Sequence, residues 1–149
     1  MLSQRTLDLI NGKNFAYFGT ISKNGYPHVT VTWVDTDGQN VIINTAVGRI
    51  KQKNAERDSK VSVTILDSAT QSTYVFITGD VIEQRTDGAD AHIDKMAKKY
   101  NDQDSFTGRE SPDEKRVMII IRPVKVVELF HLFAGRLWIV SRDRHRSQL

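Results

Sequence analysis

The segment 43–54, Ile-Asn-Thr-Ala-Val-Gly-Arg-Ile-Lys-Gln-Lys-Asn, combines residue types that could hold an anion. It starts as the end of a strand, turns at Gly48 and opens a helix at Arg49. Arg49 and Lys51 would then lie in the first helical turn, where cations oppose the helix macrodipole. A bound phosphate would resolve this conflict, because free backbone N–H groups, the Thr45 hydroxyl and both cations could converge on it. An exposed basic helix that pairs with the acidic segment 80–114 explains the pattern equally well.

The rest of the sequence lacks the usual patterns of side-chain catalysis. There is no cysteine, which excludes disulfides, thiolate catalysis and cysteine-bound metals. The sequence contains no Gly-x-Ser-x-Gly, no Walker loop, no Gly-x-Gly-x-x-Gly and no His-Glu-x-x-His. The four histidines are scattered without metal-ligand spacing, so we expect no metal site. If the protein is an enzyme, this pattern favours a bound cofactor as the source of the chemistry.

Short and regularly spaced turn signals predict a mainly β domain with inserted helices. Asn24-Gly25 and Asp37-Gly38 are typical of tight hairpins, whose turn positions need positive φ. Strands are expected over 15–21, 28–34, 41–45, 61–66, 73–82, 117–121 and 124–129. Pro123 between the last two indicates a strand break or a bulge. Seven strands joined by tight turns favour a closed or split antiparallel barrel.

Three helices are expected, over 3–12, 49–57 and 90–100. Ser3 and Gly12 are suited to cap the start and the end of the first. In the third, apolar residues recur at i, i+3, i+4 and i+7, which predicts one buried face. The polar stretch 101–115 that follows predicts a loop.

The strand at 28–34 alternates strictly between apolar and polar residues. Val29, Val31 and Trp33 fall on one face, and Thr30 and Thr32 on the other. We expect Trp33 to pack in the barrel core. The face that carries Val29, Val31 and Trp33 is too apolar for one small barrel and needs cover, which favours a homodimer.

The 149 residues suit one domain, and charge is unevenly spread along them. Residues 49–60 and 136–149 each carry a net charge of +3, whereas 80–114 carry −5. We therefore divide the chain into a domain at 1–135 and a basic C-terminal tail at 136–149. The first ten residues hold no apolar stretch, so we expect no signal peptide and a cytoplasmic location. The longest apolar run, 117–121, is far too short to span a bilayer, and we expect no membrane partner.

Several segments carry a family resemblance through their order and spacing. They are the hairpin 18–33, the strand end and helix start at 44–54, the strand start at 58–63, the segment 74–83, the helix end Lys98-Lys-Tyr100 and Arg122-Pro123. Together they resemble the pyridoxamine 5'-phosphate oxidase-like split-barrel family, and most closely its branch of deazaflavin-dependent oxidoreductases that use coenzyme F420. The likeness covers about residues 4–130. It implies a flavin-binding split β-barrel that forms a homodimer with shared cofactor sites.

Carried over to this sequence, the resemblance implies a set of cofactor-binding residues. The tricyclic ring would lie against His28, Val29, Thr30, Val31 and Thr32. The ring or the ribityl chain would contact Asn44 and Thr45. The phosphate would be held first by Lys51, with Arg49, Lys53 and Asn54 behind it, and Tyr74 is a further candidate. Flavin-binding relatives carry an Arg-Lys pair where this chain has Ile50-Lys51, with the arginine one place earlier at Arg49.

The resemblance implies an oxidoreductase in which coenzyme F420 exchanges a hydride with a small organic substrate. FMN is the alternative cofactor, since both use the same phosphate anchor. Two non-catalytic alternatives remain: a flavin-storing or haem-handling protein on the same barrel, and a barrel that binds single-stranded nucleic acid. Aromatic residues make up only 8% of the chain, and we therefore do not expect a nucleic-acid partner.

Overall fold

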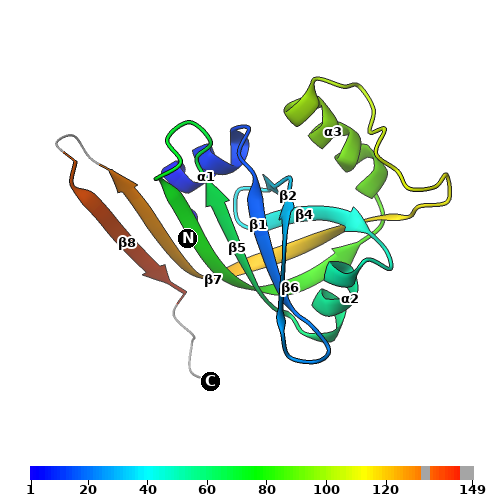
Figure 1. Ribbon diagram of the computed structural model, residues 1–149, viewed down its shortest axis with the longest axis horizontal. Helices are drawn as coiled ribbons and strands as arrows, with labels where there is room; N and C mark the ends of the chain where they lie inside the picture. The colour runs from blue at the N-terminus through cyan, green and yellow to red at the C-terminus, as the bar shows by residue number, and fades with distance from the viewer. Residues whose placement is uncertain (132–134, 145–149) are drawn as a thin grey trace.

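The computed structural model describes residues 1–131 and 135–144. In these ranges three helices accompany an antiparallel sheet of eight strands (Figure 1). The helices are α1 (Gln4–Asn11), α2 (Ile50–Arg57) and α3 (Ala89–Asn101). The strands are β1 (Ala16–Ile21), β2 (Pro27–Thr32), β3 (Asp35–Thr36), β4 (Val41–Ala46), β5 (Lys60–Leu66), β6 (Tyr74–Arg85), β7 (Arg116–His131) and β8 (Leu137–Asp143). They are ordered β2-β1-β5-β6-β7-β4-β3, and β8 pairs with β7. The mainly β architecture with inserted helices is as the turn spacing predicts.

The helices begin and end close to the residues that the sequence indicates. The Ser3 hydroxyl accepts a hydrogen bond from the Thr6 amide at 3.1 Å, and Gly12 follows the last residue of α1. α3 buries Ile93, Met96 and Ala97, which are three of the four residues on its predicted apolar face. Among the described residues, no helix is long and apolar enough to cross a membrane.

The core lies on the inner face of the sheet. Phe18, Val63, Ile77 and Val126 are all fully buried, and each is the cross-strand partner of the next, from β1 through β5 and β6 to β7. Such rows of directly opposed apolar side chains stabilise a sheet. Full burial of each side chain contributes about 1.5–3 kcal/mol to stability. This continuous row holds β7, whose start borders the site described below, against β6, β5 and β1.

Strand β2 turns its valines outward, where they form part of the apolar face that the sequence indicates needs cover. Val29 and Val31 are 59% and 57% exposed, whereas Thr30 and Thr32 are half-buried. Alternation separates the two faces of a strand but does not say which one is covered. The register decides it here: Val29 lies opposite Gly19, on the outer face of the sheet.

The expectation that Trp33 packs in the barrel core is wrong. β2 ends at Thr32, and the next fully buried side chain is Val34. The Trp33 ring instead stacks on Tyr100 of α3, with ring centroids 5.1 Å apart and an interplanar angle of 4°. Trp33 therefore packs between the barrel and α3.

β7 is one strand of 16 residues, where the sequence predicts two. Pro123 does not end it, because it lies opposite Gly79 at a register shift in the β6–β7 pairing. The predicted bulge is thus present without a break. A Cβ on Gly79 would lie 2.7 Å from the Arg122 carbonyl oxygen, so the two strands approach this closely only with glycine here.

The segment 136–149, expected as a basic tail, contains strand β8. Leu137–Asp143 pairs with Lys125–His131 of β7, and the resulting hairpin extends from one end of the sheet (Figure 1). Residues 132–134 and 145–149 lie outside the described residues.

Candidate functional site

A cleft of about 230 Å³ lies where the ends of β2 and β4 meet the starts of α2 and β7. We call it the cation cleft, because three of its side chains are cations. It is lined by Phe15, Val31, Thr32, Trp33, Asn44, Thr45, Arg49, Lys51, Ile93, Phe106 and Arg116.

The three cations are unequally neutralised. Arg49 and Arg116 share the carboxylate of Glu114, at 3.5 Å and 2.6 Å respectively. Lys51 forms no ion pair among the described residues. Burial lowers the pKa of Lys51, and the charges of Arg49 and Arg116 lower it further. A bound anion would relieve this repulsion, and Lys51 is the side chain best placed to bind it.

The start of α2 adds backbone donors to the same region. Gly48 has a φ of 93°, which lets the chain turn from β4 into the helix. Arg49 is the N-cap residue without a side-chain capping bond, and the first turn contains no acidic residue. The first amides of a helix have no partner within it, so the region around Ile50 and Lys51 attracts anions.

The structure confirms the pairing of the basic helix with the acidic segment and leaves Lys51 available for the anion-binding interpretation. Arg49 pairs with Glu110 at 3.1 Å, which is the predicted contact with the acidic segment 80–114. Lys51 faces the cleft and has the properties expected of an anion ligand.

Three buried polar atoms, two on β2 and one on β4, also fit a ligand. His28 Nδ1, Thr30 Oγ1 and Thr45 Oγ1 have no hydrogen-bond partner among the described residues. Thr45 is 1% exposed and lines the cation cleft. Buried polar side-chain atoms in proteins are nearly always hydrogen-bonded. The residues present therefore fit a bound molecule with polar edges and an anionic group.

Aromatic rings form a wall of the cation cleft. Trp33 lies between Tyr100, on which it stacks, and Phe106, whose ring it meets edge to face at 5.9 Å between centroids. The Arg116 guanidinium lies 5.1 Å from the Phe106 ring centroid. This wall offers a flat apolar surface beside the cations, which suits a planar ring with a charged tail.

The loop 101–115 supplies part of that wall. Phe106 is held in place by its own amide, which donates to the Asp94 carboxylate of α3 at 2.8 Å. The contact between Glu110 and Arg49 ties the loop to the start of α2. The sequence predicts the loop but not its approach to the site.

The sequence matches the family model described as pyridoxamine 5'-phosphate oxidase over residues 2–130. The chain belongs to this family. The predicted resemblance and the split-barrel fold are thereby confirmed. Members of the pyridoxamine 5'-phosphate oxidase family bind flavin-type cofactors.

Solved structures of similar fold agree with this assignment. An F420 reductase superposes with a TM-score of 0.72 at 21% identity, over 84% of this chain and 98% of that one. A putative pyridoxamine 5'-phosphate oxidase from Listeria innocua gives 0.63 at 18% identity, over 83% and 94%. HupZ from Group A Streptococcus gives 0.60 at 24% identity, over 91% and 97%. At these identities the likeness shows the fold alone. No curated protein matches the sequence significantly.

The cation cleft of this family member unites six of the residues predicted to bind cofactor. They are Val31, Thr32, Asn44, Thr45, Arg49 and Lys51. His28 and Thr30 lie further along the half-buried face of β2.

The other predicted residues lie elsewhere. Lys53 is exposed on α2. Asn54 is buried and donates to the Thr20 hydroxyl at 3.0 Å, so it fastens α2 to β1. Tyr74 lies in β6 opposite Leu129.

Arg116, Phe106, Phe15 and Trp33 line the cleft but were not among the predicted site residues. Arg116 had a readable signal, since an arginine immediately precedes the apolar run 117–121 and must be buried or paired where that strand enters the sheet. The sequence gives no comparable signal for Phe106, because it lies in a polar loop.

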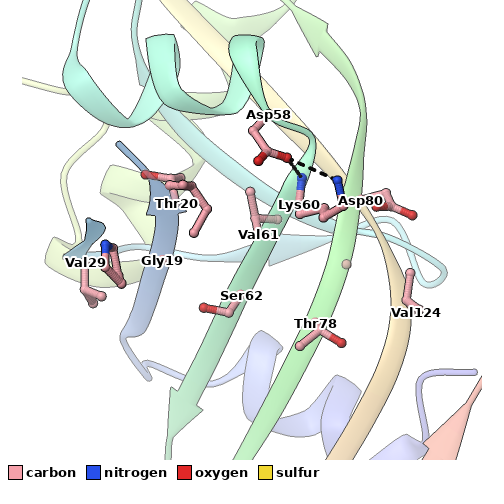
Figure 2. Close-up of a pocket in the computed structure, with 13 residues that line it drawn as sticks. Gly19, Thr20, Val29, Asp58, Lys60, Val61, Ser62, Thr78, Asp80 and Val124 are labelled. Carbon is pink, nitrogen blue, oxygen red and sulfur yellow. Dashed lines mark hydrogen bonds and ion pairs between the residues drawn. The ribbon is translucent and has the colours of Figure 1, made fainter. Parts of the chain in front are cut away.

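A second and larger hollow of about 470 Å³ lies on the outer face of the sheet (Figure 2). We call it the outer-face pocket; Gly19, Val29, Ser62, Thr78 and Val124 are among its lining residues. Of the predicted site residues, Val29 lines this pocket rather than the cation cleft.

The charges around the outer-face pocket are paired. Figure 2 shows Asp58 beside Lys60, whose amide donates to the carboxylate at 3.0 Å. Asp80 lies 3.6 Å from the guanidinium of Arg122. This pocket therefore lacks the uncompensated charge of the cation cleft.

Proposed function

We propose that this protein is an oxidoreductase that binds a flavin-type cofactor, coenzyme F420, in the cation cleft. Hydride would pass between the cofactor and a small organic substrate. The observation that carries the proposal is the convergence of Arg49, Lys51 and Arg116 on a cleft whose buried Thr45 hydroxyl has no hydrogen-bond partner in the described part of the chain. Membership of a flavin-binding family supports it.

The side chains of the cleft have separate tasks in this proposal. Lys51 and the first amides of α2 bind the phosphate group, and Arg49 adds positive charge beside them. Trp33 and Phe106 exclude water and provide a surface on which a planar ring can lie. The redox chemistry itself is supplied by the cofactor when it is bound. The protein positions the reacting groups and keeps solvent away.

The surplus of cations supports F420 over FMN within this proposal. FMN needs one phosphate site, which Lys51 and the helix start would provide. F420 carries a longer anionic tail, for which exposed Lys53 on the same helix offers a further cation. FMN remains the alternative cofactor, and direct titration distinguishes the two.

A homodimer completes this proposed site. Val29, Val31, Tyr17 and Ile21 are exposed on neighbouring strands β1 and β2 and form an apolar surface. Exposed apolar surfaces of this kind mark protein interaction sites. Because Val31 also lines the cation cleft, a second copy that covers this surface would form one wall of the cleft. This placement supports a homodimer with shared cofactor sites.

Fluorescence titration of FMN and F420 into the purified protein tests the function. Wild type should bind at least one of them, and Lys51→Ala should weaken that binding about ten- to a hundredfold, because a charge-assisted hydrogen bond contributes about 1.5–3 kcal/mol. Lys53→Ala is the matched control, because Lys53 is an exposed lysine two residues further along the same helix. It should leave FMN binding unchanged and reduce F420 binding by less than Lys51→Ala does.

The visible spectrum of the loaded protein gives a second readout, since flavin and deazaflavin bands differ. Equal affinities in wild type and Lys51→Ala would show that Lys51 does not bind the phosphate group. A wild-type protein that binds neither cofactor would reject the function.

A further inference from the structure

A chain of hydrogen bonds runs from a buried carboxylate to the wall of the cation cleft. Asp35 of β3 lies 3.0 Å from Nε2 of His92 in α3. His92 Nδ1 lies 3.0 Å from Nδ2 of Asn44 in β4. The Asn44 carbonyl oxygen, Oδ1, accepts from Arg116 Nε at 3.0 Å. Two elements remote in sequence, α3 and β7, thus converge on one amide side chain of the cleft.

The direction of every bond in this chain is determined by Arg116. An arginine can only donate, so the group of Asn44 that faces it is the carbonyl oxygen. The Asn44 nitrogen must then point the other way, where it donates to the Ala89 carbonyl at 2.9 Å and to His92 Nδ1. His92 Nδ1 is therefore the acceptor, and the ring proton lies on Nε2, directed at the Asp35 carboxylate.

Asp35 is charged in this arrangement. Burial alone would raise the pKa of its carboxyl, but hydrogen bonds from His92 and Lys95 hold that pKa well below its usual range. Lys95 Nζ lies 3.0 Å from the same Oδ2 atom that His92 approaches. A buried carboxylate held in this way fixes the orientation and the tautomer of the imidazole ring.

The consequence for Asn44 concerns what it can offer a ligand. Both of its N–H bonds are occupied, by Ala89 and His92, and one lone pair of Oδ1 is taken by Arg116. Among the described residues, nothing donates to the second lone pair of Oδ1, so this lone pair can accept a hydrogen bond from a ligand. Asn44 is consequently an acceptor and not a donor toward anything bound in the cleft.

We propose that His92 and Asp35 are positioning residues that hold Asn44 as a hydrogen-bond acceptor, so that the cleft selects a cofactor with an N–H or hydroxyl donor at this point. The proposal rests on the proposed function, because it takes a flavin-type cofactor as the ligand. It adds the polarity of one contact and the two residues that set it. Neither residue lines the cleft, and both act through Asn44.

Two substitutions of His92 test its two hydrogen bonds one at a time, the bond at Nδ1 with Asn44 and the bond at Nε2 with Asp35. The amide of His92→Asn lies near the former Nδ1 position and can still accept from Asn44, but it cannot reach Asp35. The amide of His92→Gln lies near the former Nε2 position and keeps a donor toward Asp35 while the acceptor for Asn44 is lost. A purely structural role for His92 would make the two variants alike or favour Gln, which keeps the bond to the buried charge.

Fluorescence titrations of FMN and F420 into wild type and both variants measure the effect. His92→Gln should bind the preferred cofactor about five- to tenfold more weakly, the effect of one unsatisfied hydrogen-bonding group, and His92→Asn should stay within about threefold of wild type. Melting temperatures of the three proteins control for stability. Equal losses in the two variants, or a larger loss in His92→Asn, would overturn the proposal.

The nitrogen-15 NMR spectrum of histidine-labelled, cofactor-free protein tests the arrangement without any ligand. We expect a neutral ring for His92 with a proton on Nε2 and none on Nδ1, assigned by its loss in His92→Gln. A proton on Nδ1 would overturn the proposal whatever the binding data show. If wild type binds neither cofactor, the proposed function fails and so does the ligand assigned to Asn44, whereas an unprotonated Nδ1 would still confirm the hydrogen-bonded arrangement.

Discussion

The outer-face pocket has about 470 Å³ of space and the cation cleft about 230 Å³, yet the smaller hollow carries the features of a binding site. Glycines line the larger one at points where neighbouring residues approach too closely for a side chain. Gly19 and Gly79 form part of it, and a Cβ on Gly19 would lie 2.4 Å from the Ser62 hydroxyl. Its charged groups, such as Asp58 with Lys60, neutralise each other.

The cation cleft differs because its groups are not satisfied by the chain itself. Lys51 has no ion pair, and the Thr45 hydroxyl has no hydrogen-bond partner, among the described residues. Folding the chain leaves both groups at a cost that a ligand would offset. Unpaired charged and polar groups, more than volume, thus distinguish the cation cleft from the outer-face pocket.

Two arginines of β7 give the sharpest contrast between the two regions. Arg116→Ala should destabilise the protein by about 3–5 kcal/mol, because it removes the nearer partner of the buried Glu114 carboxylate, at 2.6 Å, and leaves only the 3.5 Å contact with Arg49. Arg122→Ala, which removes the exposed pair with Asp80, should cost less than about 1 kcal/mol. Urea unfolding followed by circular dichroism measures both. Similar losses would mean that the two ion pairs are equally exposed in solution.

A charge on the outer face tests whether that region belongs to an interface. In the proposed homodimer, Val29→Arg would bury a charge between two copies and weaken association by at least about a hundredfold. Val47→Arg, at another exposed valine outside the apolar surface, is the control and should change nothing. Light scattering at micromolar concentration reports the mass. A wild-type monomer, or a Val29→Arg dimer of unchanged affinity, would separate the outer face from self-association.

Trp33 tests the aromatic wall against the core. Because it is only half-buried, Trp33→Ala should cost about 2 kcal/mol, less than the roughly 3–5 kcal/mol expected for fully buried Phe18→Ala. Cofactor affinity should fall in the Trp33 variant, since a flat surface of the cleft is lost. Equal losses of stability in the two variants would mean that Trp33 contributes as much to stability as a core residue does.

Substitution of Asp35 should give the smallest loss of stability in this series, comparison variants aside, and the size of that loss should depend on pH. The pKa of Asp35 is lower in the folded than in the unfolded protein, so the stability it contributes is present above the unfolded value and is lost as pH falls through the folded one. Asp35→Asn should remove about 1.5 kcal/mol at neutral pH and flatten the loss of stability below about pH 4. Asp104→Asn, at a carboxylate 98% exposed, is the control. Parallel acid profiles in wild type and Asp35→Asn would contradict the assignment.

Local features of the sequence predicted local structure well. Ser3 and Gly12 delimit α1, and the i, i+3, i+4 spacing of Ile93, Met96 and Ala97 identifies the buried face of α3. The turn at Gly48 with Arg49 and Lys51 behind it predicted the helix start that forms the cation cleft. These predictions succeed because caps, periodicity and positive φ depend on neighbours within a few residues.

The sequence did not predict features of the strands that depend on residues from a distant segment. The alternation in β2 identified two faces, but the pairing of Val29 with Gly19 determined that the valines lie outside. Pro123 was expected to separate two strands, but the glycine opposite it in β6 accommodates the bulge and β7 continues. In both places the deciding residue comes from another strand, and no local pattern contains it.

The sequence by itself determined the mainly β fold, the three helices and the basic helix start in the segment 43–54, because each depends on short-range physical chemistry. Only the tertiary structure brought Arg116, Phe106 and His92 to that segment. Arg116 lies 72 residues from Asn44, and His92 lies 48 residues from it, so their contacts exist only once β4, β7 and α3 have packed together. The charge of the cleft is thus encoded locally, whereas the direction of its hydrogen bonds is set by residues that only folding makes neighbours.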